Sequence, residues 1–86
     1  MELDEMRVQL NGIDDQLKAL FLERMQIVKK IGDYKIANDL PTYDPSREEA
    51  MAKRLSADLE GNIRELYLEF LKNYVSLSRK YQDSFR

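Results

Sequence analysis

Two basic residues, Arg24 and Lys35, are spaced so that they could bind one small anion. Upstream of Arg24, apolar residues recur at spacings of three and four along one helical face, namely Leu3, Met6, Leu10, Ile13, Leu17 and Leu20. Arg24 takes the next position on this face, and the apolar pattern resumes at Ile27. Lys35 follows about three helical turns later, so both cations share a face and lie about 16 Å apart along the axis.

A guanidinium in an apolar stripe is costly unless it is paired, so Arg24 has two interpretations. It could form a salt bridge with a glutamate of this chain or of a second copy. It could instead bind a carboxylate or phosphate, which the planar guanidinium holds through two hydrogen bonds. The shared face with Lys35 favours anion binding, although a lysine there also suits the C-terminal dipole of a helix.

Arg7 is a third basic candidate, but it precedes Arg24 by about 25 Å along a helix axis and about 100° around it. One helix therefore cannot bring both residues to a small ligand. Two antiparallel copies could, with Arg7 of one chain entering the pocket of the other. The alternative is an exposed arginine that pairs with Glu2 or Asp4.

Polar residues in two later segments extend this set. In "DPSREE", Arg47 and Glu48 fall in the first turn of a predicted helix, where the helix dipole by itself also favours an acidic residue. Ser78 and Gln82 are four residues apart and share a helical face near the end of the chain.

The composition limits the possible chemistry. The 86 residues contain no cysteine and no histidine, which removes disulfides, thiolate chemistry and the commonest general base and metal ligand. The formal charge of −2 gives no bulk attraction to nucleic acid or acidic membranes. No apolar run approaches the ~20 residues of a transmembrane helix, and the acidic N-terminus does not resemble a signal peptide. We expect one domain, residues 1–86, in the cytoplasm.

A first helix is predicted from about Asp4, a plausible N-cap, to about Asn38, which suits a left-handed helix end. The sequence "NDLPTYDP" then breaks the helix, because Pro41 disfavours helical backbone before it. Gly12 and Gly32 lie inside, each at a cost of about 1 kcal/mol relative to alanine. Such a helix is roughly 50 Å long.

A second helix is predicted from about Pro45 to Leu59. Asp44 can be its N-cap with proline at the first helical position, and Ser46 with Glu49 offers an alternative capping box.

A third helix follows the turn at 60–62 and runs from about Ile63 to Asp83, with an apolar stripe made of Ile63, Leu66, Tyr67, Phe70, Leu71, Tyr74, Leu77 and Tyr81. The fold class is therefore all-α, with one long helix and two shorter ones. The long helix cannot bury its stripe against two short partners alone, so we expect an intertwined helical homodimer.

Taken together, these residues resemble the all-helical chorismate mutase family, whose members occur alone or fused to prephenate dehydratase or dehydrogenase. The matching stretches are "MRVQLNGIDDQLKALFLERMQIVKKIGDYK", "LPTYDPSREE" and "SRKYQ". They contain R-x16-R-x10-K, then D-x2-RE, then S-x3-Q, and cover almost the whole chain.

The resemblance implies an intertwined homodimer that converts chorismate to prephenate by a Claisen rearrangement in phenylalanine and tyrosine biosynthesis. It implies that Arg24 and the Arg7 of the other chain bind the substrate carboxylates. Arg47 would support a carboxylate and Ser78 would contribute nearby, with Ser76 as the alternative serine.

The resemblance also implies that Lys35 and Gln82 donate hydrogen bonds to the ether oxygen of the substrate. Glu48 and the backbone near Asp44 would hold the ring hydroxyl. The rearrangement is unimolecular and needs no cofactor, metal or nucleophile, so it suits a chain without histidine or cysteine. Catalysis would restrain a flexible dianion and stabilise charge on the ether oxygen.

Two other functions compete with this one. A lyase on the same fold, which releases pyruvate from isochorismate to leave salicylate, would use much the same cationic pocket. A non-catalytic helical dimerisation module would instead pair Arg24 and Lys35 with protein carboxylates, and methionine at these positions would be neutral or stabilising.

Overall fold

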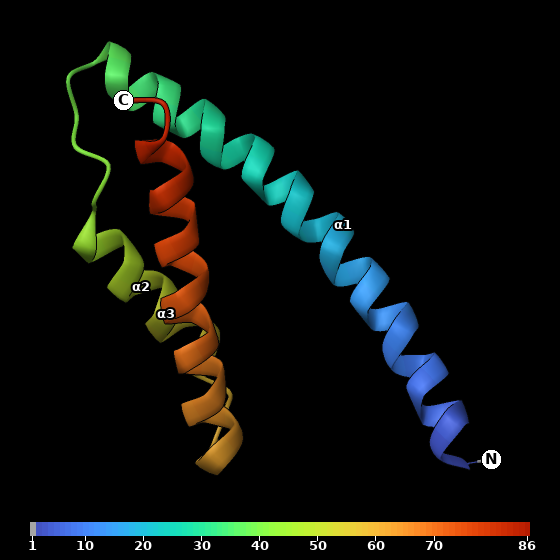
Figure 1. Ribbon diagram of the computed structural model, residues 1–86. Coiled ribbons are helices and arrows are strands. Elements are labelled where there is room, and N and C mark those ends of the chain that lie inside the picture. The colour runs from blue at the N-terminus through green and yellow to red at the C-terminus, as the bar shows by residue number, and fades with distance from the viewer. Residues whose placement is uncertain (1) are drawn as a thin grey trace.

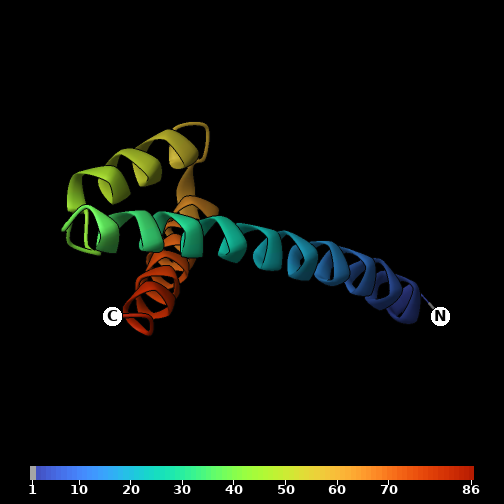
Figure 2. The same ribbon diagram turned by 90° about the horizontal axis from the view of Figure 1, so that it is seen from above.

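The computed structural model describes residues 2–86 and consists of three helices: α1 (Glu2–Ala37), α2 (Pro45–Ser56) and α3 (Gly61–Asp83). The predicted all-α class is confirmed. The molecule is elongated, with extents of 55 × 27 × 15 Å. The C-terminal half of α1 packs against α3, which also packs against α2, whereas the blue N-terminal half of α1 extends away from both (Figure 1). The view from above shows this half projecting alone (Figure 2).

Both ends of α1 differ slightly from the prediction. The helix starts at Glu2, so Asp4 lies in an acidic first turn rather than at the N-cap. At the other end the left-handed residue is Asp39, with φ of 57°, and not Asn38. Asn38 stays in register because both its backbone N–H and its side-chain amide donate to the carbonyl of Tyr34, at 3.0 and 2.9 Å.

The turn after α1 satisfies the last carbonyls of the helix. The N–H of Asp39 bonds to the carbonyl of Ile36, and the N–H of Leu40 bonds to that of Lys35 at 2.7 Å. This is the Schellman pattern, which ends a helix and reverses the chain. It directs the connecting segment back toward the face of α1 that carries Lys35.

Asp44 is the N-cap of α2, as predicted. Its Oδ1 accepts hydrogen bonds from the Arg47 N–H at 3.2 Å and from the Ser46 hydroxyl at 3.1 Å. The helix ends at Ser56, three residues before the predicted Leu59. The Leu59 N–H bonds to the Ser56 carbonyl instead, which tightens the chain into a turn.

The start of α3 was also predicted two residues late. Glu60 is extended and Gly61, with φ of 64°, opens the helix, so the predicted turn at 60–62 lies partly inside α3. Glycine adopts this left-handed conformation without the steric cost that other residues meet.

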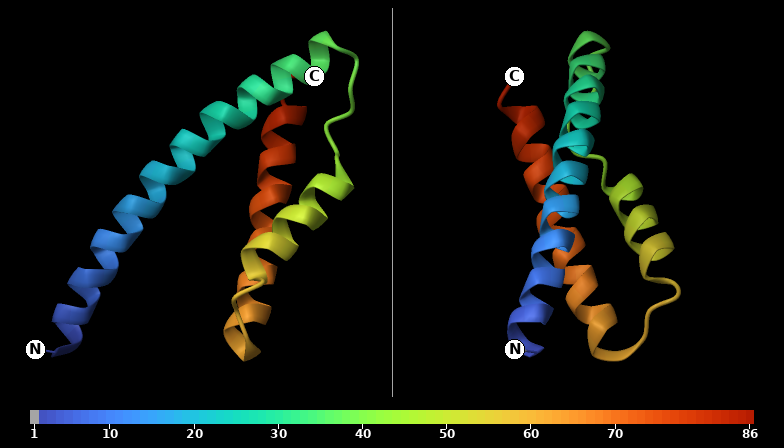
Figure 3. Two further views of the ribbon diagram at one scale, coloured as in Figure 1. Left: turned by 180° about the vertical axis from the view of Figure 1, so that it is seen from behind. Right: turned by 90° about the vertical axis from the view of Figure 1, so that its right-hand side faces the viewer.

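The interior of the single chain is small. Among the described residues, Val28 of α1 and Leu71 of α3 are the buried apolar side chains. Aromatic contacts extend this core, with ring centroids 6.2 Å apart for Phe21 and Tyr74 and 5.4 Å apart for Phe70 and Tyr74. The predicted apolar stripe of α1 from Leu3 to Leu20 is exposed, because the N-terminal half of α1 lies apart from α2 and α3 (Figure 3, left). Within residues 2–86, no helix is long and apolar enough to cross a membrane.

Candidate functional site

All three helices and the segment between α1 and α2 line one cavity of about 260 Å³. The structure brings seven of the eight sequence-predicted site residues to this cavity, namely Arg24, Lys35, Asp44, Arg47, Glu48, Ser78 and Gln82. The apolar part of the cavity wall consists of Val28, Ile31, Met51 and Val75. Most of the lining residues are thus charged or polar and four are apolar, a composition that suits a small charged ligand.

On α1, Arg24 and Lys35 are half-buried and face the cavity. The Arg24 guanidinium donates to the Ser78 hydroxyl and lies 4.5 Å from the ring centroid of Tyr74. The Lys35 ammonium donates to the Thr42 carbonyl at 2.9 Å. Within residues 2–86, neither cation forms a salt bridge. Pairing of Arg24 with a glutamate of its own chain is therefore not what the structure shows.

On α3, the polar face predicted from the spacing of Ser78 and Gln82 points into the protein, and both side chains are buried. Ser78 accepts from Arg24 and donates to the Tyr74 carbonyl at 3.2 Å. Gln82 donates through Nε2 to the Val28 carbonyl of α1 at 2.8 Å. Ser76, the alternative serine, is exposed, so the register of α3 brings Ser78 to the cavity.

A close approach of α1 and α3 fixes the position of Gln82. Gly32 is buried, and a Cβ atom added there would lie 3.0 Å from Cγ and 3.4 Å from Cβ of Gln82. Because glycine has no Cβ, the Gln82 side chain can lie directly over α1 and reach the Val28 carbonyl. The glycine that weakens the isolated helix thus allows a contact between helices.

At the start of α2, Asp44 is occupied with capping and Arg47 is exposed at the edge of the cavity. Glu48 is half-buried and forms an ion pair with Arg79 of α3. Sequence reasoning assigned no role to Arg79. The partner of Arg79 is 31 residues away on another helix, so no spacing within one helix could reveal the pair. The one sequence feature that pointed to Arg79 was its position next to Ser78.

The electrostatics of the cavity favour an anion. Four cations line it, Arg24, Lys35, Arg47 and Arg79, against the two carboxylates of Asp44 and Glu48. The hydrogen bond to Glu48 raises the pKa of Arg79, against the opposing effect of desolvation. Clefts lined by a surplus of one charge concentrate ligands of the opposite charge.

Arg7 is the one predicted site residue outside the cavity. It is exposed on the N-terminal half of α1, which extends away from the other helices (Figure 1). In a single chain it cannot reach a ligand bound beside Arg24, as the helical spacing of the two residues predicted.

A sequence profile for one protein family, described as chorismate mutase type II, matches residues 6–83. The chain belongs to this family. The profile covers α2, α3 and all of α1 after its first four residues, so the chorismate mutase type II match includes every residue of the cavity.

Individual relatives agree with this assignment. A T-protein of Haemophilus influenzae is 32% identical over 85 residues, which is 96% of this chain and 22% of the relative. A bifunctional chorismate mutase/prephenate dehydratase of Aquifex aeolicus is 30% identical over 88 positions, covering 92% of this chain and 24% of the relative. A T-protein of Enterobacter agglomerans is 32% identical over 76 residues. The chain spans less than a quarter of the length of these curated relatives.

Proposed function

We propose that the chain is a chorismate mutase, which rearranges chorismate to prephenate in the cavity between its three helices. The observation that carries this proposal is the free cationic face of α1. Arg24 and Lys35 face a cavity of about 260 Å³ without a carboxylate partner among the described residues. A dimerisation module would pair these charges, whereas a site for a dianion must leave them available.

The hydrogen bonds of the cavity suit the proposed roles. Arg24 binds one substrate carboxylate, with Ser78 fixing its orientation and Arg47 adding charge at the edge. Lys35 has three N–H donors and uses one on Thr42, and Gln82 has two and uses one on Val28. Both side chains are thus held by the protein and keep a donor for the ether oxygen of the substrate.

Catalysis then follows from restraint and electrostatics. The site holds a flexible dianion in a compact conformer, which lowers the entropic part of the barrier. Negative charge that develops on the ether oxygen as the C–O bond breaks is stabilised by the fixed Lys35 ammonium. Glu48 and the backbone near Asp44 hold the ring hydroxyl. No residue acts as a nucleophile in this scheme.

The working unit that we propose is a homodimer in which Arg7 acts in the site of the other chain. The exposed stripe of α1 supports it, because an unpaired apolar face of this length needs a partner. An apolar groove of about 410 Å³ between α1 and α3 continues this surface. It is lined by Leu17, Phe21, Phe70 and Leu77. We propose that α1 of the second copy covers it. A single domain over residues 1–86 and a cytoplasmic location stay predictions.

The first test is to incubate the purified chain with chorismate, and separately with isochorismate, and to identify the products by NMR. Prephenate from chorismate is the expected product. Salicylate and pyruvate from isochorismate alone would assign the chain to the lyase reaction. A folded dimer that makes neither product would contradict both enzymatic assignments and favour the dimerisation module.

Gly32→Ala should lower kcat about tenfold, because the added methyl group pushes the Gln82 side chain off its present position by a few tenths of an ångström. Helix propensity alone predicts that the same substitution raises the free energy of unfolding by about 1 kcal/mol, so a lower kcat would not reflect a less stable helix. Steady-state kinetics with chorismate measure the effect, and Gly12→Ala is the matched control, since a Cβ there meets open space. Equal activity of the two variants would show that Gly32 does not position Gln82.

A further inference from the structure

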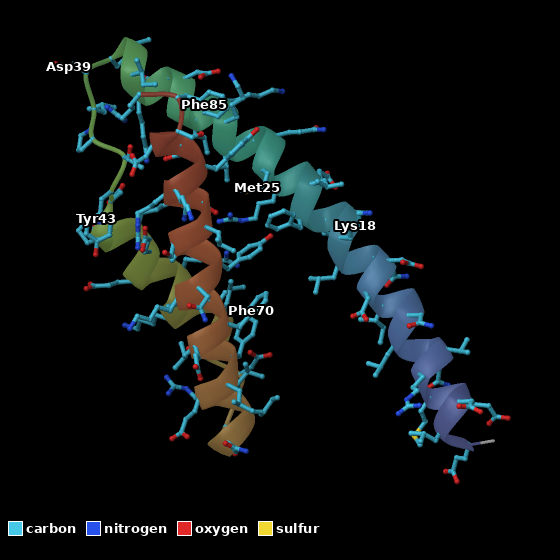
Figure 4. The ribbon with its side chains drawn as sticks, in the orientation of Figure 1. Lys18, Met25, Asp39, Tyr43, Phe70 and Phe85 are labelled. Atoms are coloured by element: carbon cyan, nitrogen blue, oxygen red, sulfur yellow. The ribbon has the colours of Figure 1, made fainter. Side chains whose placement is uncertain are left out.

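The ion pair between Glu48 and Arg79 is the one salt bridge between helices among residues 2–86. It joins α2 to α3, and the two side chains are 24% and 31% exposed. The Arg79 guanidinium also lies 4.7 Å from the ring centroid of Tyr43. Figure 4 shows Tyr43 beside the start of α2, at the end of the connecting segment. Stacking and ion pairing therefore hold the guanidinium from two sides.

Glu48 poses an electrostatic problem for a site that binds a dianion. A carboxylate in the wall of a small cavity repels a doubly charged ligand, and partial burial strengthens the repulsion relative to water. Arg24 and Lys35 lie on α1, across the cavity, and their hydrogen bonds go to Ser78 and to the Thr42 carbonyl. Arg79 is the cation that contacts the Glu48 carboxylate directly.

The ion pair also lies between two cavities. Glu48, Met51, Val75 and Arg79 line both the site and a neighbouring cavity of about 270 Å³ between α2 and α3. Without a tether, the Glu48 side chain could rotate toward either space. The contact with Arg79 removes this freedom and leaves the second carboxylate oxygen for another donor.

We propose that Arg79 is a positioning residue, which fixes the Glu48 carboxylate in the wall of the site and offsets its charge so that the site accepts a dianionic substrate. This inference rests on the proposed function, since it assumes that Glu48 faces bound chorismate. It assigns Arg79 no contact with the substrate.

The test is a double-mutant cycle of Arg79→Met and Glu48→Gln, read as kcat and KM for chorismate. Arg79→Met should raise KM about tenfold with a smaller change in kcat, because uncompensated repulsion weakens ground state and transition state alike. In the Glu48→Gln background, where no carboxylate charge remains, the same replacement should change KM less than about twofold. Arg79→Lys keeps the charge but loses the planar guanidinium, so its KM should lie between those of wild type and Arg79→Met.

Lys80→Met is the matched control, because it also removes one positive charge from α3. Lys80 follows Arg79 in the sequence, but its side chain is exposed and does not line the cavity. Thermal melts by circular dichroism confirm folding of each variant. An unchanged KM in Arg79→Met would overturn the proposal. An equal effect of Arg79→Met in both backgrounds would also overturn it, since that result assigns Arg79 a role independent of Glu48.

A second readout does not depend on turnover. In the free wild-type protein, NMR should show slower exchange of the Arg79 guanidinium protons than of those of exposed Arg54, and Glu48→Gln should reduce the difference. If the Arg79 guanidinium protons exchange as fast as those of Arg54, Arg79 is not held by Glu48 and the proposal is wrong. A wild-type chain that makes no prephenate but keeps the slow exchange would refute the proposed function and the substrate part of the inference, while the tether stands.

Discussion

Lys35→Ala should lower kcat at least 10²-fold with a smaller change in KM, because the ammonium acts mainly on charge that appears as the C–O bond breaks. The structure holds this group in place before any ligand arrives. Its Nζ donates to the Thr42 carbonyl at 2.9 Å, and the Schellman turn after Ala37 brings Thr42 back toward the α1 face that carries Lys35. The cation therefore needs little reorganisation during the reaction.

Separate measurements of rate and of melting temperature distinguish a loss of catalysis from a loss of stability. A 10²-fold loss corresponds to about 2.7 kcal/mol of transition-state stabilisation. Removing a charged hydrogen bond and a basic residue from the last turn of α1 lowers the free energy of unfolding by about 1–3 kcal/mol, which the melting temperature reports separately. At a temperature where circular dichroism shows the variant folded, the rate loss cannot come from unfolding.

Lys30→Ala is the matched control, since Lys30 is exposed on the same helix and does not line the cavity. It should keep the wild-type kcat. Lys35→Arg should retain part of the activity, because charge survives while the donor geometry changes. A loss of only two- or threefold in Lys35→Ala would contradict the role given to this residue at the ether oxygen.

Helical periodicity explains why part of the site could be predicted from sequence. Arg24 and Lys35 belong to one unbroken helix, whose regular geometry requires residues eleven apart to share a face. The same reasoning applies to Ser78 and Gln82, which are four apart on α3 and both buried. Relations within one helix depend on local geometry alone, and these predictions agree with the structure.

Relations between helices could not be predicted in this way. The contact of Glu48 with Arg79 depends on where α2 ends and how sharply the chain turns, and the predicted turn placed both ends wrongly. Gly32 is similar: its cost to α1 could be predicted from propensity, but its close contact with Gln82 requires the position of α3. The left-handed residue after α1 is Asp39 and not the predicted Asn38, whose side chain bonds to the preceding turn.

The largest test of assembly concerns Arg7. Arg7→Ala and Arg24→Ala homodimers should each be nearly inactive, because each lacks one cation for a substrate carboxylate in both sites. If Arg7 acts in the site of the other chain, a heterodimer of the two variants has one site with both defects and one site with neither. Random mixing makes about half of the dimers mixed, so activity should recover to about one quarter of wild type.

The cavity supplies a control for this experiment. Arg24 and Lys35 line the same cavity of one chain, so mixed Arg24→Ala and Lys35→Ala chains always leave one defect in each site and should show no recovery. Mass spectrometry of isotope-labelled chains verifies subunit exchange in both mixtures. An absence of recovery for the Arg7 and Arg24 pair after verified exchange would contradict the action of Arg7 in the other chain's site. Recovery in both mixtures would instead contradict the assignment of Arg24 and Lys35 to one site.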